Sequence, residues 1–337
     1  MIDASNAFNL LNRQVALHTI RERCPSFHCF LKNCHKNPTE LYVVDSNRNK
    51  EKILGSEGAT QGDPSAMAMY AISIQPLVYS LAHNQDPQLP PAKQAWFADD
   101  GTGGGTILQL KKMWDNVSQM GPKYGYFPKA SKSILIVKGL ENLPKAKSVF
   151  KNTGVQVKID GDRHLGAVLG SESFKQEFVK RKIGSWVKDV EKLAVVAEEE
   201  PQFAYSAFTK GLSSRWCYMQ RTIEGISELF NPLEDAICKS LIPAILGRNV
   251  DSLERDMLAL PLRYGGLGIQ NPAKTADREY EASKRITRQL TDLIFNQDQD
   301  LSKLDRSLIN KTKAELRLEK DKIICCRKEQ TRKPDYV

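Results

Sequence analysis

Hydrophobic and polar positions change their spacing part of the way along the chain. Up to about residue 172, short apolar stretches are separated by Gly, Pro and Asn, a pattern typical of strands and short helices. After about Ser173, apolar residues recur at helical spacing, at Ile183, Trp186, Val187, Val190 and Ala194 and again at Tyr205, Phe208, Leu212 and Trp216. The pattern predicts a mixed α+β region followed by a helical one.

Helix-capping residues place three helices in the first region. Asn12 is a suitable N-cap for a helix that continues to about Arg23, and Thr106 for one from Ile107 to about Met120. Asp63 and Pro64 suit the N-cap and first position of a helix that reaches Gln75, where Pro76 kinks or ends it. Residues 64–82 carry no charge but fall short of a membrane span, so we expect this helix to be buried.

Alternating residues around turns predict hairpins. Strands over Thr39–Asp45 and Lys50–Gly58 are expected around a turn at residues 46–48. A strand is expected over Ser133–Lys138, and a hairpin over Val155–Ile159 and Arg163–Leu169 that turns at residues 160–162.

In the stretch Trp96–Thr102 an apolar strand leads into two adjacent acids, and a glycine-rich turn with Gly101, Gly103, Gly104 and Gly105 follows. A tight turn here lifts Asp99 and Asp100 off the end of a hairpin. Such an acidic pair suits Mg²⁺, which takes one or two carboxylates together with substrate phosphates. Taken alone, this is a weak signal, because two acids beside glycine more often form a solvated surface turn.

The second region ends in charged sequence. Asp251 with Glu254 resembles a capping box, residues 260–268 suggest a sharp turn, and a further helix is expected from about Thr275. From Lys311 the chain is highly charged, which indicates a frayed helix or disorder. We therefore expect three parts, residues 1–172, 173–300 and 301–337.

The net charge and the cysteine content of the chain indicate its type of partner and its cellular compartment. The net charge is +9 and the pI is near 9.1, which favours nucleic acid as a partner, although solubility alone would also explain the charge. Seven cysteines at irregular spacing indicate reduced thiols. No secretory signal or transmembrane helix is expected, so a cytoplasmic or nuclear location is predicted.

A cluster of Cys24, Cys29 and Cys34 with His28 and His35 raises the possibility of zinc. The spacings are not the paired close ones of structural zinc sites, so ordinary helix packing is favoured.

Five short motifs occur in an order that resembles the palm and thumb of reverse transcriptases, over roughly residues 1–290. They are Asp3 with Phe8 five residues later, Gln61-Gly62-Asp63-Pro64, Phe97-Ala98-Asp99-Asp100, the loop Gly125–Lys132, and His164-Leu165-Gly166. Residues 260–269 are similar to a stretch in enzymes of non-long-terminal-repeat retrotransposons. The resemblance implies an antiparallel palm sheet backed by helices, then a helical thumb, in a chain truncated before the fingers.

The resemblance also implies a reaction and its residues. Two Mg²⁺ ions, or Mn²⁺, would be held by Asp3, Asp99 and Asp100 for nucleotidyl transfer from dNTPs to a DNA primer on an RNA template. Phe8 would select deoxynucleotides, and Gln61 and Gly62 would line the nucleotide and template side. Lys132 would lie near the triphosphate as a catalytic residue and could protonate the leaving pyrophosphate. Leu165 and Gly166 would belong to the primer grip.

Two other functions are compatible with this sequence. A non-catalytic nucleic-acid-binding remnant of such an element would keep the basic helical region without turnover. A metal-dependent hydrolase would use the same acids but would not need Phe8, Gln61 or a thumb.

Overall fold

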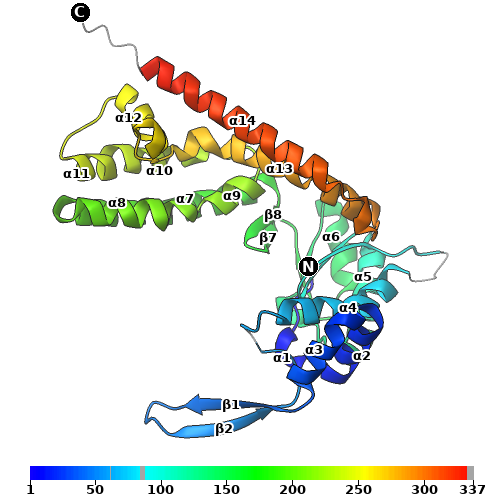
Figure 1. The fold of residues 1–337 in the computed structure, drawn as a ribbon. Helices are drawn as coiled ribbons and strands as arrows, with labels where there is room; N and C mark the ends of the chain where they lie inside the picture. Colours follow the sequence, from blue (N-terminus) through cyan, green and yellow to red (C-terminus); the bar gives the residue numbers. More distant parts are fainter. Residues whose placement is uncertain (61, 84–87, 332–337) are drawn as a thin grey trace, which may run out of the picture. The chain divides into compact units, whose positions relative to one another are not determined.

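The computed structural model describes residues 1–60, 62–83 and 88–331. It divides into two compact units, Met1–Ile159 (unit 1) and Asp160–Val337 (unit 2), which Figure 1 shows coloured along the sequence. Unit 1 mixes helices with short strands and unit 2 is mostly helical, in agreement with the α+β expectation at that level. The division falls earlier than the expected boundary after residue 172, and the charged tail belongs to unit 2.

Unit 1 contains helices, short 3-10 turns and six strands within its described residues. In chain order they are α1 (Ala7–Leu10), α2 (Arg13–Arg23), α3 (Pro25–His35), β1 (Thr39–Val44), β2 (Lys50–Gly55), α4 (Ala66–Ala82), β3 (Lys93–Phe97), β4 (Asp100–Gly104), α5 (Ile107–Met120), η1 (Gly121–Tyr124), η2 (Ala130–Lys132), β5 (Ile134–Ile136), η3 (Leu140–Asn142), α6 (Leu143–Val149) and β6 (Gln156–Lys158).

The capping residues of α2 and α5 act as predicted. The Asn12 side chain accepts a hydrogen bond from the Val15 backbone N–H at 3.1 Å. Thr106 and Gln109 form a complete capping box, in which each side chain accepts from the other residue's backbone N–H. These bonds satisfy N–H groups that have no partner inside the helix.

Helix α4 begins two residues later than predicted, and it continues through Pro76, which the sequence left open as either a kink or an end. It begins at Ala66, because the Asp63 side chain accepts hydrogen bonds from the Ser65 backbone and hydroxyl and forms a turn before the helix. It continues past Pro76 to Ala82. Packing of the apolar face of α4 in the core of unit 1 compensates for the backbone hydrogen bond that the proline removes.

Strand pairing confirms one predicted hairpin and corrects another. Strands β1 and β2 pair antiparallel, and Figure 1 shows them extending away from the helices of unit 1. The expected hairpin of residues 155–159 with 163–169 is wrong, because β6 instead pairs in parallel with β5. Its second strand belongs to a separate hairpin, β7 (Gly161–His164) and β8 (Ala167–Gly170), which turns at Leu165 and Gly166.

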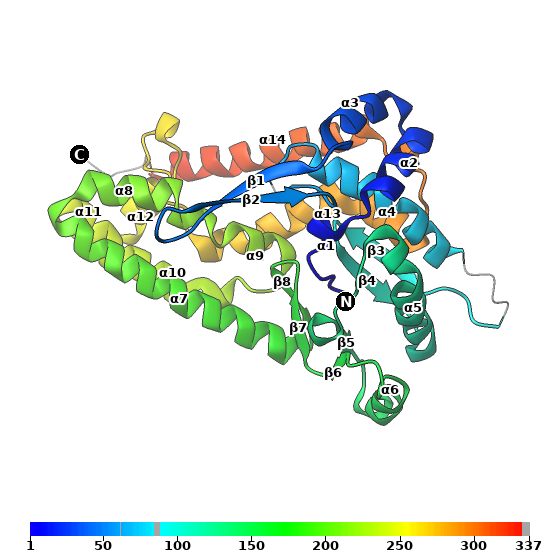
Figure 2. The same ribbon diagram turned by 90° about the horizontal axis from the view of Figure 1, so that it is seen from below.

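The core of unit 1 collects around α4. Met69, Tyr70, Ile74 and Leu77 on one face of this helix are buried together with Leu11, Ile20, Val117 and Tyr126 from other elements. Figure 2 shows β3 and β4 beside α5, which contacts β4 and α4. The acidic hairpin is thus attached to the main apolar core.

Unit 2 follows the β7–β8 hairpin with a helical array. Its helices are α7 (Glu172–Glu199), α8 (Pro201–Lys210), η4 (Leu212–Ser214), α9 (Cys217–Thr222), η5 (Glu228–Phe230), α10 (Asn231–Ala236), the π-helix η6 (Ile237–Leu241), α11 (Ile242–Leu246), α12 (Ser252–Leu258), η7 (Leu262–Tyr264), α13 (Pro272–Asn296), η8 (Leu301–Lys303) and α14 (Arg306–Thr331).

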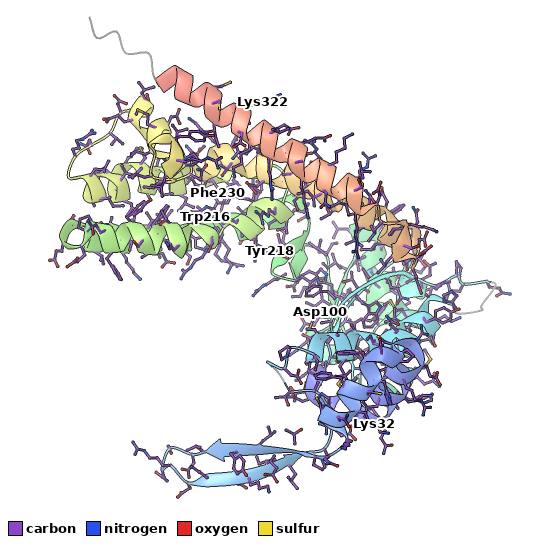
Figure 3. The ribbon with its side chains drawn as sticks, in the orientation of Figure 1. Lys32, Asp100, Trp216, Tyr218, Phe230 and Lys322 are labelled. Atoms are coloured by element: carbon purple, nitrogen blue, oxygen red, sulfur yellow. The ribbon has the colours of Figure 1, made fainter. Side chains whose placement is uncertain are left out.

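An aromatic cluster fills the core of unit 2. Trp186 of α7 contacts Trp216 and Phe230, and Phe208 of α8 contacts Trp216. Figure 3 labels Trp216 and Phe230 among the helices of unit 2. The apolar residues expected from helical spacing are therefore core residues, although α8 ends at Lys210 and Leu212 lies in a separate 3-10 turn.

Polar contacts join the later helices of unit 2. Asp251 and Glu254 form the predicted capping box of α12. Buried Arg255 makes a two-bond ion pair with Glu234 of α10 and donates to the Ile269 carbonyl. The charged tail forms α14, which contacts α12 and α13. Every helix in the described residues is either too short or too polar to cross a lipid bilayer.

Candidate active site

The first residues of the chain form an extended segment beside the acidic hairpin. Ile2 and Gly101 exchange both backbone hydrogen bonds, at 2.7 and 3.0 Å. Ala4 forms a second antiparallel bridge with Pro128. Asp3 therefore lies between two bridged residues and next to the start of β4, although Asp99 follows it by almost a hundred positions in the sequence.

Backbone contacts on the other side hold Asp3 in place. Its carbonyl accepts from the Lys129 N–H at 2.8 Å, and its own N–H donates to the Ser133 hydroxyl at 3.2 Å. The buried Ser133 hydroxyl donates in turn to the Lys129 carbonyl. Ser133 thus positions the backbone of Asp3, a role that could not be predicted because nothing local marks a serine as the partner of a distant backbone group.

The turn between β3 and β4 consists of Ala98 and Asp99, with Phe97 and Asp100 as the closing pair. The glycines expected in the turn lie after it, in and beyond β4, which corrects that part of the prediction. Ala98 has φ of +52°, a conformation that costs a non-glycine residue energy and that often marks a functional site. The Tyr126 hydroxyl donates to the Asp99 carbonyl at 2.8 Å and supports the turn.

The three predicted acids lie close enough to influence one another. Burial, followed by the negative charges of Asp99 and Asp3, raises the pKa of Asp100 above its ordinary value. Burial also raises the pKa of Tyr70 and Tyr126, and both phenols are affected by Asp99 and Asp100. The site therefore combines three carboxylates with two buried tyrosines, Tyr70 and Tyr126.

This arrangement fits a divalent cation in its chemistry. Carboxylate oxygens are the ligands that Mg²⁺ and Mn²⁺ prefer, and a cation would offset the repulsion that raises the pKa of Asp100. As the side chains stand, no three His, Cys, Asp or Glu groups of the described residues converge closely enough to enclose an ion. The residues that would hold the metal are Asp3, Asp99 and Asp100.

Phe8 of α1 packs against one of these tyrosines. Its ring stacks on Tyr70 of α4 with centroids 4.6 Å apart and the planes inclined by 23°. The Tyr70 hydroxyl is buried and has no hydrogen-bond partner among the described residues. No motif in the sequence singles out Tyr70. Its only local signal is its place on the apolar face of α4.

Two of the other predicted site residues of unit 1, Gly62 and Lys132, lie among the described residues. Gly62 has φ of +95°, and a side chain there would meet no atom of the described residues within 4 Å. Gln61 lies outside the described residues. Lys132 ends η2, is exposed, and immediately precedes the Ser133 that binds Asp3.

Leu165 and Gly166 form the tip of the β7–β8 hairpin in unit 2. Both have positive φ, +49° and +82°, as a two-residue turn of this kind requires. The Tyr218 hydroxyl donates to the Leu165 carbonyl at 2.5 Å, and its ring lies against Gly166. Figure 3 labels Tyr218 and, in unit 1, Asp100.

Comparison with known proteins adds no family to this description. A scan against protein-family models found no match, and a search of curated proteins found no significant similarity.

Proposed function

We propose that the chain is a nucleic-acid polymerase of the reverse transcriptase type, which transfers deoxynucleotides from dNTPs to a primer on an RNA template. One observation carries the proposal: a backbone bridge between Ile2 and Gly101 brings Asp3 to the Asp99–Asp100 hairpin. Asp3 and Asp99 are far apart in sequence, so only the fold can bring them close together. The turn that carries Asp99 also has an unfavourable backbone conformation at Ala98.

Each residue has a definite task in this proposal. Asp3, Asp99 and Asp100 would hold two divalent ions, which would supply electrostatic stabilisation for an in-line displacement at phosphorus. Asp3, Asp99 and Asp100 supply the negative charge that attracts those cations. Lys132 is assigned to the triphosphate, where its ammonium group offsets the charge of the departing pyrophosphate.

Phe8 is assigned to sugar selection. An aromatic ring at this place leaves no room for a 2′-hydroxyl, so a deoxynucleotide fits and a ribonucleotide does not. The stacking of Phe8 on buried Tyr70 supports the assignment, because a ring fixed in position excludes a group better than a mobile one.

Unit 2 is assigned to duplex binding. Lys180, Arg181, Lys188 and Lys192 are exposed along α7, and such cations contact phosphate backbones without reading sequence. Most of the chain's net charge of +9 lies in residues 1–159, so the assignment of unit 2 rests on the exposed cations of α7.

Primer extension on an RNA template with Mg²⁺ and dNTPs tests the proposal. We expect Asp99→Asn to lower extension by at least about a thousandfold, since it removes a group that acts directly on the reacting centre. Asp115→Asn is the matched control, because Asp115 is an exposed acid of α5 that pairs with Lys111. Equal extension by wild type and Asp99→Asn would refute the proposal.

A second candidate is a nucleic-acid-binding protein without turnover, which the exposed cations of α7 support as well as they support a polymerase. Protein that binds an RNA–DNA duplex in a salt-dependent manner but extends no primer, with either Mg²⁺ or Mn²⁺, would support this candidate instead.

A further inference from the structure

Phe8 lies on an element that cannot hold its own shape. Helix α1 has only four residues and starts after Asn6, whose φ is +45°. An isolated helical turn of this length is unstable, because its nucleation cost exceeds what one turn of hydrogen bonds returns. Phe8 is partly exposed, whereas its neighbour Ala7 is buried. The place of the Phe8 ring therefore depends on contacts with other elements.

Backbone contacts fix the main chain of α1. The Phe8 carbonyl accepts from the Ala59 N–H at 2.8 Å, and the Leu11 carbonyl accepts from the Gly58 N–H at 2.9 Å. A side chain at Gly58 would lie 2.5 Å from the Phe8 carbonyl oxygen, so the two segments are in close contact. These contacts hold the Phe8 backbone, but they do not determine the direction of its ring.

Tyr70 supplies the contact that fixes the ring. The rings of Phe8 and Tyr70 stack with centroids 4.6 Å apart and planes inclined by 23°, within the range of favourable aromatic pairs. Tyr70 belongs to the 17-residue helix α4 and is 1% exposed, so the surrounding core holds its own ring in place. Within the described part of the chain, Tyr70 is the only aromatic residue whose ring contacts that of Phe8.

The ring of Tyr70 makes this contact without help from its hydroxyl. The hydroxyl is buried and has no hydrogen-bond partner among the described residues. An unsatisfied buried hydroxyl costs stability, so its removal should be neutral or favourable. Phenylalanine at this position would keep the stacking, whereas an aliphatic side chain would fill most of the space but offer no flat surface to Phe8. The two kinds of substitution therefore separate the ring from the hydroxyl.

We propose that Tyr70 is a specificity-determining positioning residue, which stacks on Phe8 and fixes its ring where that ring excludes a 2′-hydroxyl. The proposal rests on the proposed polymerase function, in which Phe8 selects the sugar. Tyr70 is buried, so it acts through Phe8 and does not touch the nucleotide. Sugar selection is thus divided between a partly exposed ring that meets the substrate and a buried ring that determines its position.

The expected signature follows from how steric exclusion works. Misplacement of a positioned group by about 1 Å can change a rate by about a hundredfold. A Phe8 ring that moves away by a similar distance leaves room for the 2′-hydroxyl of a ribonucleotide. Deoxynucleotides need no such room, so loss of the support should increase the use of ribonucleotides and affect deoxynucleotides little. A general loss of stability would instead lower the use of both.

Primer extension with dNTP or rNTP tests the proposal through the ratio of the two kcat/KM values. For Tyr70→Leu we expect this ratio to fall about tenfold, chiefly because kcat/KM for rNTP rises. Tyr70→Phe should keep the wild-type ratio. The matched control is Phe150→Leu, which removes another buried ring of the same core and should also keep the ratio. An unchanged ratio in Tyr70→Leu, or an equal fall in either of the other variants, would overturn the proposal.

A double variant shows whether Tyr70 acts through Phe8. Phe8→Ala removes the excluding ring, so the addition of Tyr70→Leu should change the ratio no further. Two effects that multiply would overturn the positioning role, because Tyr70 would then act by another route. Tyr70→Met is a second variant in case Tyr70→Leu does not fold, since its flexible side chain fills irregular space without a ring. The same fall in the ratio is expected for it.

NMR of selectively labelled phenylalanine tests the contact without requiring catalysis. The Phe8 signal is assigned by its absence in Phe8→Ala. We expect restricted motion of the Phe8 ring in the wild type and in Tyr70→Phe, and faster motion of larger amplitude in Tyr70→Leu. Equal ring motion in the wild type and Tyr70→Leu would overturn the positioning role. If the wild-type chain extends no primer, the polymerase proposal fails, and the NMR result alone decides whether Tyr70 fixes the Phe8 ring.

Discussion

The β3–β4 hairpin of unit 1 and the β7–β8 hairpin of unit 2 both turn in two residues, and a tyrosine from elsewhere in the same unit binds each tip. Tyr126 donates to the carbonyl of Asp99, and Tyr218 donates to that of Leu165. The difference lies in the backbone. Leu165 and Gly166 both have positive φ, whereas in the acidic hairpin only Ala98 does.

This difference shows which of the two turns depends on tertiary contacts for its conformation. The β7–β8 turn has glycine at one of its two positive-φ positions, so local sequence favours it. The β3–β4 turn places alanine where glycine is preferred, and it is held by buried Tyr126 and by the bridge from Ile2 to Gly101. The acidic tip is therefore maintained by tertiary contacts, and the other tip largely by its own residues.

The largest loss of stability is expected from replacing the glycine that favours the β7–β8 turn. Gly166→Val places a β-branched residue at φ of +82° and against the Tyr218 ring, so we expect a loss of about 2 kcal/mol in the stability of unit 2. Urea unfolding with hydrogen exchange of residues 160–170 measures it. Gly104→Val is the matched control, since a side chain there meets no atom within 4 Å. Equal losses for both variants would contradict the comparison.

An intermediate effect is expected from removing the tyrosine hydroxyls. Tyr126→Phe should cost about 1 kcal/mol, because a hydrogen bond from a fully buried group to the Asp99 carbonyl is lost. Tyr218 is 48% exposed, so water replaces its bond and Tyr218→Phe should cost less than about 0.5 kcal/mol. Exchange of residues 96–102 and 162–168 reports the two tips separately. A larger loss of stability for Tyr218→Phe than for Tyr126→Phe would contradict the view that the acidic turn depends more on its tertiary contacts.

The smallest effect concerns pH and charge at the acidic tip. The pKa of Asp100 is raised in the folded state, so its contribution to stability is greatest below its unfolded value, near 3.9, and is lost as pH rises through the folded value. We expect Asp100→Asn to become more stable relative to wild type from pH 4 to pH 7. Urea unfolding at both pH values measures this difference.

Mg²⁺ should reduce the advantage of Asp100→Asn and protect residues 96–102 of the wild type from exchange, because a cation offsets the repulsion among the carboxylates. Identical exchange with and without Mg²⁺ would count against a metal site. The β7–β8 hairpin supplies an internal control, since Leu165 and Gly166 carry no charge.

Much of the helical structure could be predicted because helix signals are local. Asn12, Thr106 and Asp251 each cap the helix that follows them, and the bonds involved span only three residues. The spacing of Ile183, Trp186 and Val190 correctly identified buried positions of α7. Helix α4 was less predictable, because burial carries it past Pro76 against the local preference of proline.

Strand partners could not be predicted in the same way. Residues 155–159 are close in sequence to a turn at Asp160 and Gly161, which favours a hairpin, yet β6 pairs with β5 across the intervening α6. Pairing depends on the apolar surface that each strand covers, and that surface is assembled from distant segments. The candidate site shows the same division, since motif order identified Asp3, Asp99, Asp100 and Phe8 but not Tyr70 or Ser133.

The sequence by itself determined the helical periods, the caps, the positive charge and the acidic pair of this protein, because each depends on residues within a few positions of one another. Only the tertiary structure decided that Asp3 lies beside Asp100 and that Phe8 rests on Tyr70. The physical reason is that burial and backbone pairing join segments far apart in the chain, and a residue's neighbours in space, more than its neighbours in sequence, determine its charge state and its contacts.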